Sequence, residues 1–179
     1  TLVAIAREKA GIARPNVPLV CGDLPPEAMS AVRQAAKAAL LVELAGRRGA
    51  ATMHGEHQRH NAALFELSAE VPSVLRLSER AIAEGKQATV RGRYEVIAKA
   101  GRRFIVDGAH NGPAMVALRQ ALLTDPAFRP GTLVLGGTQG RASQEPLLAI
   151  DDLFERVIVC EPPTERAIPT SELKQALPR

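Results

Sequence analysis

Apolar and polar positions follow different patterns in the two halves of the chain. Up to about Val90, apolar residues mostly recur three or four positions apart, which is the period of amphipathic helices. After Val90, short apolar runs alternate with helical stretches, which is typical of strands joined by helices. We therefore expect two domains, residues 1–90 and residues 91–179.

Residues 1–90 are predicted to be rich in helix. The longest helix is expected from Pro26 to about Leu44, because apolar residues recur there at helical spacing. The other elements expected here are a helix over 5–10 that stops at Gly11, a strand over 17–20, a helix that begins with Asn61 as its cap, and a helix over 79–84 capped by Ser78.

Residues 91–179 are predicted to form an α/β domain. The expected order is strands over 94–98 and 102–106 around a turn at 99–101, a helix over 114–123, a strand over 132–135, a helix over 145–154, a strand over 157–160 and a helix over 171–177. Apolar strands separated by helices imply a mostly parallel sheet covered on both faces, with ligands at the carboxyl ends of its strands. The fold class is therefore α/β.

Composition excludes several classes of protein. Hydrophobic residues make up 46% and charged residues 23%, which is the balance of a folded globular chain. The net charge of +4 is dispersed and there are only five aromatic residues, so we expect no nucleic-acid partner. No apolar run approaches the roughly 18 residues of a membrane helix, so we expect no membrane partner. Cys21 and Cys160 lie far apart, without zinc-site spacing, which fits a cytoplasmic setting.

The strongest chemical signal is the run from Asp107 to Asn111 at the carboxyl end of an apolar strand. Asp107 can accept from hydroxyls or an ammonium group, and His110 can donate or accept a proton near neutral pH. Gly108 and Ala109 let a ligand approach the backbone. The alternative, with about equal weight, is a turn in which Asp107 and Asn111 only satisfy backbone N–H groups.

Three further segments are weaker candidates. Gln58 and Asn61 carry carboxamides that suit a purine edge, although helix capping explains Asn61 equally well, and the histidines nearby lack the partners of a metal site. Arg93 can pair with a phosphate, against the alternative of an exposed strand arginine. Residues 136–143 are rich in glycine but lack the lysine and hydroxyl of a P-loop, so we expect a flexible loop at a sheet edge.

Four segments occur together in one order. They are Ile-Ala-Arg-Glu-Lys-Ala-Gly-Ile over 5–12, His57-Gln58-x-x-Asn61-Ala62-Ala63, Gly92-Arg93-Tyr94-Glu95 and Asp107-Gly108-Ala109-His110-Asn111. With these four segments in this order, the chain resembles the folylpolyglutamate synthase/dihydrofolate synthase family, which is related to the Mur ligases. The resemblance implies that residues 1–90 are the end of a central Mur-ligase-type ATPase domain. Residues 91–179 would be a Rossmann-like C-terminal domain that is truncated at its end.

The resemblance also implies an activity. In that family, ATP phosphorylates a folate or dihydropteroate carboxylate, and the amino group of L-glutamate attacks the acyl phosphate. Lys9 resembles a lysine that becomes a Mg²⁺ ligand when carbamylated, and His110 a residue close to the reacting centre. Asn61, Arg93 and Asp107 match positions that contact ATP, in a pocket expected between the two domains. We expect a cytoplasmic monomer.

Departures from the family pattern leave two alternatives open. The phosphate-binding loop of the family would lie before Thr1, so the chain alone is expected to be inactive. The loop before His57 is short, Gly112 follows Asn111 where proline is usual, and the Asp-Lys-Asp stretch is missing after the strand over 132–135. One alternative is a non-catalytic nucleotide-binding remnant, and the other is a peptidoglycan-type Mur ligase, which the motif at Asp107–Asn111 disfavours.

Overall fold

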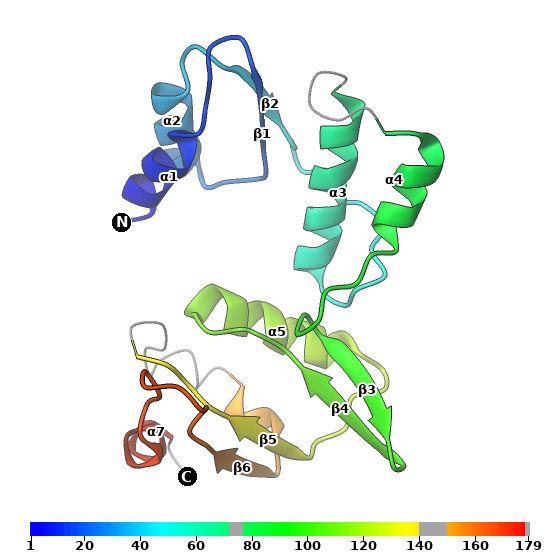
Figure 1. Cartoon of the computed structure of the whole chain (residues 1–179), viewed down its shortest axis with the longest axis vertical. Helices are drawn as coiled ribbons and strands as arrows, with labels where there is room; N and C mark the ends of the chain where they lie inside the picture. The colour runs from blue at the N-terminus through cyan, green and yellow to red at the C-terminus, as the bar shows by residue number, and fades with distance from the viewer. Residues whose placement is uncertain (72–76, 140–149, 178–179) are drawn as a thin grey trace. The chain divides into compact units, whose positions relative to one another are not determined.

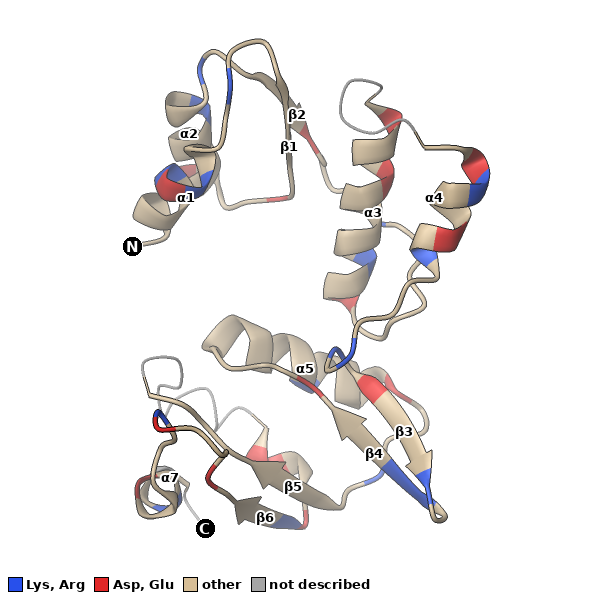
Figure 2. Ribbon diagram, in the orientation of Figure 1, with Lys and Arg blue, Asp and Glu red and all other residues tan. Residues whose placement is uncertain are grey.

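The computed structural model describes residues 1–71, 77–139 and 150–177. The chain divides into two compact units (Figure 1). Unit 1 comprises Thr1–Thr52 and His57–Ala88, and unit 2 comprises Met53–Glu56 and Thr89–Arg179. Lys and Arg are interspersed with Asp and Glu along the elements of both units (Figure 2).

Unit 1 pairs two short parallel strands and covers them with helices. Its elements are α1 (Leu2–Ala10), β1 (Pro18–Cys21), α2 (Pro26–Ala35), β2 (Leu40–Glu43), α3 (Glu56–Glu70) and α4 (Glu79–Lys86). The strands run parallel in register from Pro18 opposite Leu40 to Cys21 opposite Glu43. One core joins buried residues of α1 and α2, including Ala10 and Met29. A second core joins Leu44 to α3.

The long helix predicted from Pro26 to Leu44 is wrong beyond Ala35. Residues Leu40–Glu43 form β2 instead. Leu41 packs against the core of α1 and α2, while Val42 packs against the core around Leu44, so neighbouring side chains of β2 face different cores. A strand covered on both faces gives a continuous apolar run, which periodicity cannot distinguish from a buried helix.

The helix starts and stops of unit 1 agree with the sequence in part. The Ser78 hydroxyl accepts from the Ala81 N–H at 3.2 Å and caps α4 as predicted. The cap predicted at Asn61 is wrong, because α3 already begins at Glu56. Gly11 follows α1 as predicted, but its φ of −60° is right-handed, so the helix ends there without the left-handed turn that glycine favours.

Unit 2 combines a hairpin, a parallel strand pair and helices. Its elements are β3 (Glu95–Lys99), β4 (Arg102–Val106), α5 (Gly112–Thr124), β5 (Thr132–Leu135), the short 3₁₀ helix η1 (Asp151–Leu153), β6 (Arg156–Val159) and α7 (Thr170–Ala176). β3 and β4 are antiparallel, and both Ala100 and Gly101 adopt positive φ in the turn between them, as a tight hairpin requires. β5 and β6 are parallel.

The α/β fold class is confirmed, with a difference in how the strands are grouped. Across the described ranges the strands form three two-stranded sheets, so the continuous parallel sheet expected for the second domain is not formed there. The helix predicted over 145–154 lies partly outside the described residues. Within its described part, Asp151–Leu153 form the 3₁₀ helix η1. The glycine-rich loop predicted over 136–143 also extends beyond them. Its described start pairs with a later segment, since the Gln139 N–H donates to the Arg166 carbonyl at 2.7 Å.

Two cores stabilise unit 2. Met115, Leu135, Ile150, Ile168 and Leu173 form one of them. Tyr94, Ala121 and Leu122 form the other, against which Ile105 of β4 packs. Helix α5 contributes to both cores and therefore joins the hairpin to the parallel strands. None of the helices within residues 1–71, 77–139 and 150–177 has the length and apolar character that a membrane span requires.

Candidate functional site

The turn between β4 and α5 holds an aspartate in one orientation. Oδ2 of Asp107 accepts from the backbone N–H of Tyr94 at 2.7 Å, and Oδ1 accepts from the N–H of Ala109 at 2.8 Å. Each carboxylate oxygen has a second lone pair for a ligand. Asn111 caps α5 by accepting from the Ala114 N–H at 3.0 Å. Asp107 and Asn111 therefore do satisfy backbone groups, and the orientation of the Asp107 carboxylate is fixed in advance.

Arg93 reaches the same turn from the loop before β3. The Gly108 N–H donates to the Gly92 carbonyl at 2.8 Å, which joins the two loops. The guanidinium of Arg93 lies over Gly108, where an added Cβ would come within 2.5 Å of Nη1. A side chain at position 108 would therefore displace the Arg93 guanidinium from this turn. The arginine predicted to bind phosphate and the aspartate predicted beside it thus lie at one corner of unit 2.

His110 completes this corner, and its contact fixes a tautomer. The Nδ1 atom lies 2.8 Å from the Gly108 carbonyl oxygen. A carbonyl only accepts, so Nδ1 carries the proton and Nε2 of the neutral ring is the acceptor. The side chain is exposed. The structure therefore brings Arg93, Asp107 and His110 together.

Lys9 lies in the last turn of α1, in unit 1. Its ammonium group donates to the Glu8 carboxylate at 3.3 Å, and the Lys9 side chain is 76% exposed. A protonated amine has no lone pair for a metal ion. Within the part of the chain that the structure describes, no three His, Cys, Asp or Glu side chains are grouped to hold a metal ion.

Asn61 lies on the exposed side of α3, also in unit 1. Its Nδ2 donates to Oε1 of Gln58 at 3.1 Å, and Nε2 of Gln58 lies 3.0 Å from Nε2 of His57. Gln58 is only 4% exposed. The two carboxamides predicted as a pair are therefore in contact, and the buried Gln58 orients the exposed Asn61.

Sequence reasoning missed a second aspartate at a strand end. Asp23 follows β1, and its Oδ1 accepts from the Gly46 N–H at 2.9 Å. Its Oδ2 accepts from Arg48 at 3.2 Å and contacts His60 Nε2 at 2.8 Å. The Gly46 N–H, with His60 and Arg48, lowers the pKa of Asp23 although partial burial opposes the shift. Its position after an apolar strand is the signal that identified Asp107.

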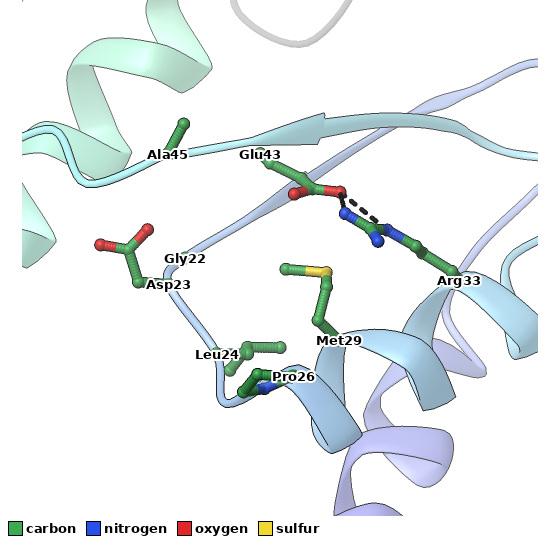
Figure 3. A pocket seen from close by; sticks show the side chains of 8 residues that line it. All are labelled: Gly22, Asp23, Leu24, Pro26, Met29, Arg33, Glu43 and Ala45. Carbon is green, nitrogen blue, oxygen red and sulfur yellow. Dashed lines mark hydrogen bonds and ion pairs between the residues drawn. The ribbon is translucent and has the colours of Figure 1, made fainter.

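A pocket of about 300 Å³ opens beside Asp23 at the carboxyl ends of β1 and β2 (Figure 3). It is lined by Gly22, Asp23, Leu24, Pro26, Met29, Arg33, Glu43 and Ala45. Arg33 and Glu43 of this lining contact each other directly, with Nε of Arg33 3.0 Å from Oε1 of Glu43. Because Glu43 already neutralises the arginine of this lining, the pocket offers no free positive charge to an anion.

Known proteins resemble this chain in sequence. The dihydrofolate synthase/folylpolyglutamate synthase of Mycobacterium tuberculosis (strain ATCC 25618 / H37Rv) is 33% identical over 129 residues, which are 69% of this chain and 26% of the relative. No protein-family model matches the chain. The chain thus spans about a quarter of the length of this curated relative.

Solved structures resemble the chain in fold over almost its whole length. The folylpolyglutamate synthase of Mycobacterium tuberculosis complexed with ADP matches with a TM-score of 0.84 and 27% identity, over 98% of this chain and 46% of that one. The folylpolyglutamate synthase of Thermotoga maritima matches with a TM-score of 0.77 and 30% identity, over 98% and 48%. The predicted resemblance to the folylpolyglutamate synthase/dihydrofolate synthase family is therefore confirmed in sequence and in fold, over about half the length of these solved proteins.

Proposed function

We propose that this chain is part of an ATP-dependent ligase that joins L-glutamate to a folate or dihydropteroate carboxylate. The observation that carries the proposal is the corner of Arg93, Asp107 and His110, in a chain with the fold of a folylpolyglutamate synthase complexed with ADP. A cation, an oriented carboxylate and an imidazole are groups that recognition of a nucleotide and acyl transfer require. The matching relatives share this function by name.

The residues at the corner have distinct proposed roles toward ATP. The guanidinium of Arg93 pairs with phosphate oxygens, since its planar fork matches their geometry. The free lone pairs of Asp107 accept from hydroxyl groups of the nucleotide. Asn61 in unit 1 contributes a carboxamide to the purine base. These are charge-assisted or directional contacts, and each therefore contributes to specificity as well as affinity.

The chemistry consists of two transfers. ATP supplies a phosphoryl group that converts the substrate carboxylate to an acyl phosphate. The amino group of glutamate then attacks the acyl carbon, phosphate leaves and an amide forms. We propose that Nε2 of His110 accepts the proton that the amine loses, because Nδ1 donates to the Gly108 carbonyl and the lone pair of Nε2 stays available.

A Mg²⁺ ion is proposed to assist the complete enzyme, although the described residues do not form a metal site by themselves. Lys9 fits such a role only as a carbamate, in which the cationic amine becomes a group with anionic oxygen ligands. Its exposure leaves the amine accessible to that modification. We further propose that the enzyme is a cytoplasmic monomer without nucleic-acid or membrane partners. The interspersed charges support the absence of a nucleic-acid partner (Figure 2).

The first test uses the complete gene product that contains this chain. ADP release should require ATP, a folate or dihydropteroate substrate, and glutamate. Arg93→Ala and Asp107→Ala should each raise the KM for ATP by about tenfold or more, since each removes a charge-assisted contact of about 1.5–3 kcal/mol. The initial rate of ADP release across ATP concentrations measures this change.

Arg91→Ala is the matched control for the arginine. Arg91 is two positions away, its side chain is 93% exposed, and it contacts Glu95 at 3.6 Å. This variant should keep the KM of the unmodified enzyme. Unchanged ATP dependence in both Arg93→Ala and Asp107→Ala would refute the proposed site. Nucleotide binding without glutamate-dependent ADP release would instead support the non-catalytic alternative.

A further inference from the structure

Tyr94 has a backbone conformation that is unfavourable for its residue type. Its φ is 48°, in the left-handed region that glycine favours. A tyrosine there persists only when the surrounding structure fixes it, and such residues are concentrated at binding and catalytic sites. Gly92 nearby also has a positive φ, of 69°, and its N–H donates to Glu95 Oε2 at 2.8 Å. The loop before β3 is therefore held in a specific shape.

The side chain of Tyr94 supplies the necessary restraint. It is 5% exposed and packs with Ala121 and Leu122 of α5. The ring of His54, from the segment Met53–Glu56 of unit 2, lies against it with 5.1 Å between ring centroids. The hydroxyl donates to Oδ2 of Asp125 at 2.9 Å. Tyr94 is thus fixed both by apolar packing and by one directional contact.

Asp125 is itself a rigid partner. It is 6% exposed, its Oδ2 also accepts from Arg103 at 2.5 Å, and its Oδ1 accepts from the Ala127 N–H at 2.8 Å. Burial alone would raise the pKa of Asp125, but the hydrogen bonds from Arg103, Ala127 and Tyr94 outweigh burial and lower it. Burial and then Asp125 raise the pKa of Tyr94. The phenol therefore stays protonated and donates to a carboxylate.

The backbone of the same residue supports the candidate site. The Tyr94 N–H donates to Oδ2 of Asp107, and its direction depends on the left-handed conformation of the residue. A loop in the ordinary right-handed or extended conformation would turn this N–H away from the carboxylate. Tyr94 thus connects the buried Asp125 to the exposed corner at Asp107.

We propose that Tyr94 is a positioning residue for nucleotide binding. The Tyr94 hydroxyl is fixed on Asp125, and this contact orients the Tyr94 backbone N–H that holds the Asp107 carboxylate for binding. The inference rests on the proposed function, because it takes Asp107 to contact ATP. Tyr94 does not touch the nucleotide itself. Tyr94 raises the fraction of enzyme molecules in which the Asp107 carboxylate has the orientation that binds the nucleotide.

The test is the Tyr94→Phe variant of the complete enzyme. The substitution removes one oxygen and keeps the ring, so the core around α5 is retained. The KM for ATP should rise about 3- to 10-fold, as expected for loss of one buried hydrogen bond, with kcat at saturating ATP and the KM for glutamate unchanged. In an Asp107→Ala background, Tyr94→Phe should have no further effect on the KM for ATP, because the group it positions is missing.

Leu173→Ala is the control for a purely structural effect. Leu173 is 3% exposed in the other core of unit 2, around Met115 and Ile150, and Tyr94 is not part of that core. It should lower the Tm at least as much as Tyr94→Phe and leave the KM for ATP unchanged. A raised KM in Asp107→Ala with a normal KM in Tyr94→Phe would overturn the positioning role alone. A normal KM for ATP in Asp107→Ala would instead overturn the proposed role of Asp107, on which this inference rests.

Discussion

Asp23 and Asp107 serve the same local purpose at the ends of two strands. Asp23 accepts from the Gly46 N–H after β1, and Asp107 accepts from the Tyr94 and Ala109 N–H groups after β4. In both places a carboxylate satisfies backbone donors that would otherwise lack a partner, and so it fixes the shape of a loop. A residue that shapes a loop in this way is also held ready to contact a ligand.

The sequence alone indicated Asp107, His110 and Arg93 as candidate site residues, but it could not indicate the groups that hold them. An acidic residue and an imidazole after an apolar strand are visible in the sequence. One of the two donors to Asp107 is the backbone N–H of Tyr94, which lies on the other side of the hairpin and has a conformation that its residue type does not favour. The anchor at Asp125 is similarly remote. Such contacts depend on tertiary structure, which the local pattern does not encode.

Lys9→Arg should abolish the Mg²⁺-dependent turnover of the complete enzyme. A guanidinium cannot form the carbamate that the proposed metal ligand requires, since it stays protonated. The Tm should be unchanged because the side chain is exposed and its ion pair with Glu8 lies at the surface. Rates measured across Mg²⁺ and bicarbonate concentrations test this.

Arg7→Lys, in the same last turn of α1, is the control for Lys9→Arg and should keep full activity. Full activity of Lys9→Arg itself would remove Lys9 from the site.

At the scale of elements, the hairpin and the strands β1, β5 and β6 were predictable from the sequence, while β2 was not. The turn at Lys99-Ala100-Gly101 lies between two strands that pair as predicted. Strand β2 was mistaken for helix because its register with β1 and its two apolar faces arise only when α1, α2 and α3 pack around it. Local residue preferences decide a surface hairpin, whereas tertiary packing decides a covered strand.

The loops that join β1, β2 and α3 should lose stability in acid. The pKa of Asp23 is lowered in the folded chain. The ionised carboxylate therefore stabilises the fold when the pH is above the ordinary carboxyl pKa of 3.8. That stabilisation is lost as the pH falls below 3.8 and through the still lower folded value, because the unfolded chain then binds more protons. The free energies of unfolding in urea of wild type and Asp23→Asn should differ at pH 7, and the difference should shrink as the pH falls below 3.8.

Glu165→Gln is the control for Asp23→Asn. Glu165 is an exposed carboxylate in unit 2, and its substitution should leave the urea midpoint nearly unchanged at pH 7 and at pH 3. A constant difference between wild type and Asp23→Asn from pH 7 to pH 3 would contradict the role of the ionised carboxylate.

At the scale of the whole molecule, each unit has its own cores. Leu44 is fully buried with Ala63 and Leu67 in unit 1, and Ile150 is buried with Met115 in unit 2. The change of sequence pattern after Val90 indicated a second α/β part. What the pattern could not indicate is that Met53–Glu56 groups with unit 2, since the contact of His54 with Tyr94 joins residues far apart in sequence.

Leu44→Ala should destabilise unit 1 by about 2–5 kcal/mol, because it leaves a cavity in a closed core. Hydrogen exchange followed by mass spectrometry should show faster exchange in β1, β2 and α3 and unchanged exchange in α5. Leu24→Ala, at a leucine that is 39% exposed, should have a much smaller effect. Equal loss of protection in both units would contradict the assignment of separate cores.

The excursion of Met53–Glu56 into unit 2 has a practical consequence for anyone who wishes to isolate that unit. A single cut between Ala88 and Thr89 yields a polypeptide that lacks the imidazole covering Tyr94. An isolated unit 2 would need the segment Met53–Glu56 joined to its N-terminus by a linker, so that the Tyr94 side chain keeps its surroundings.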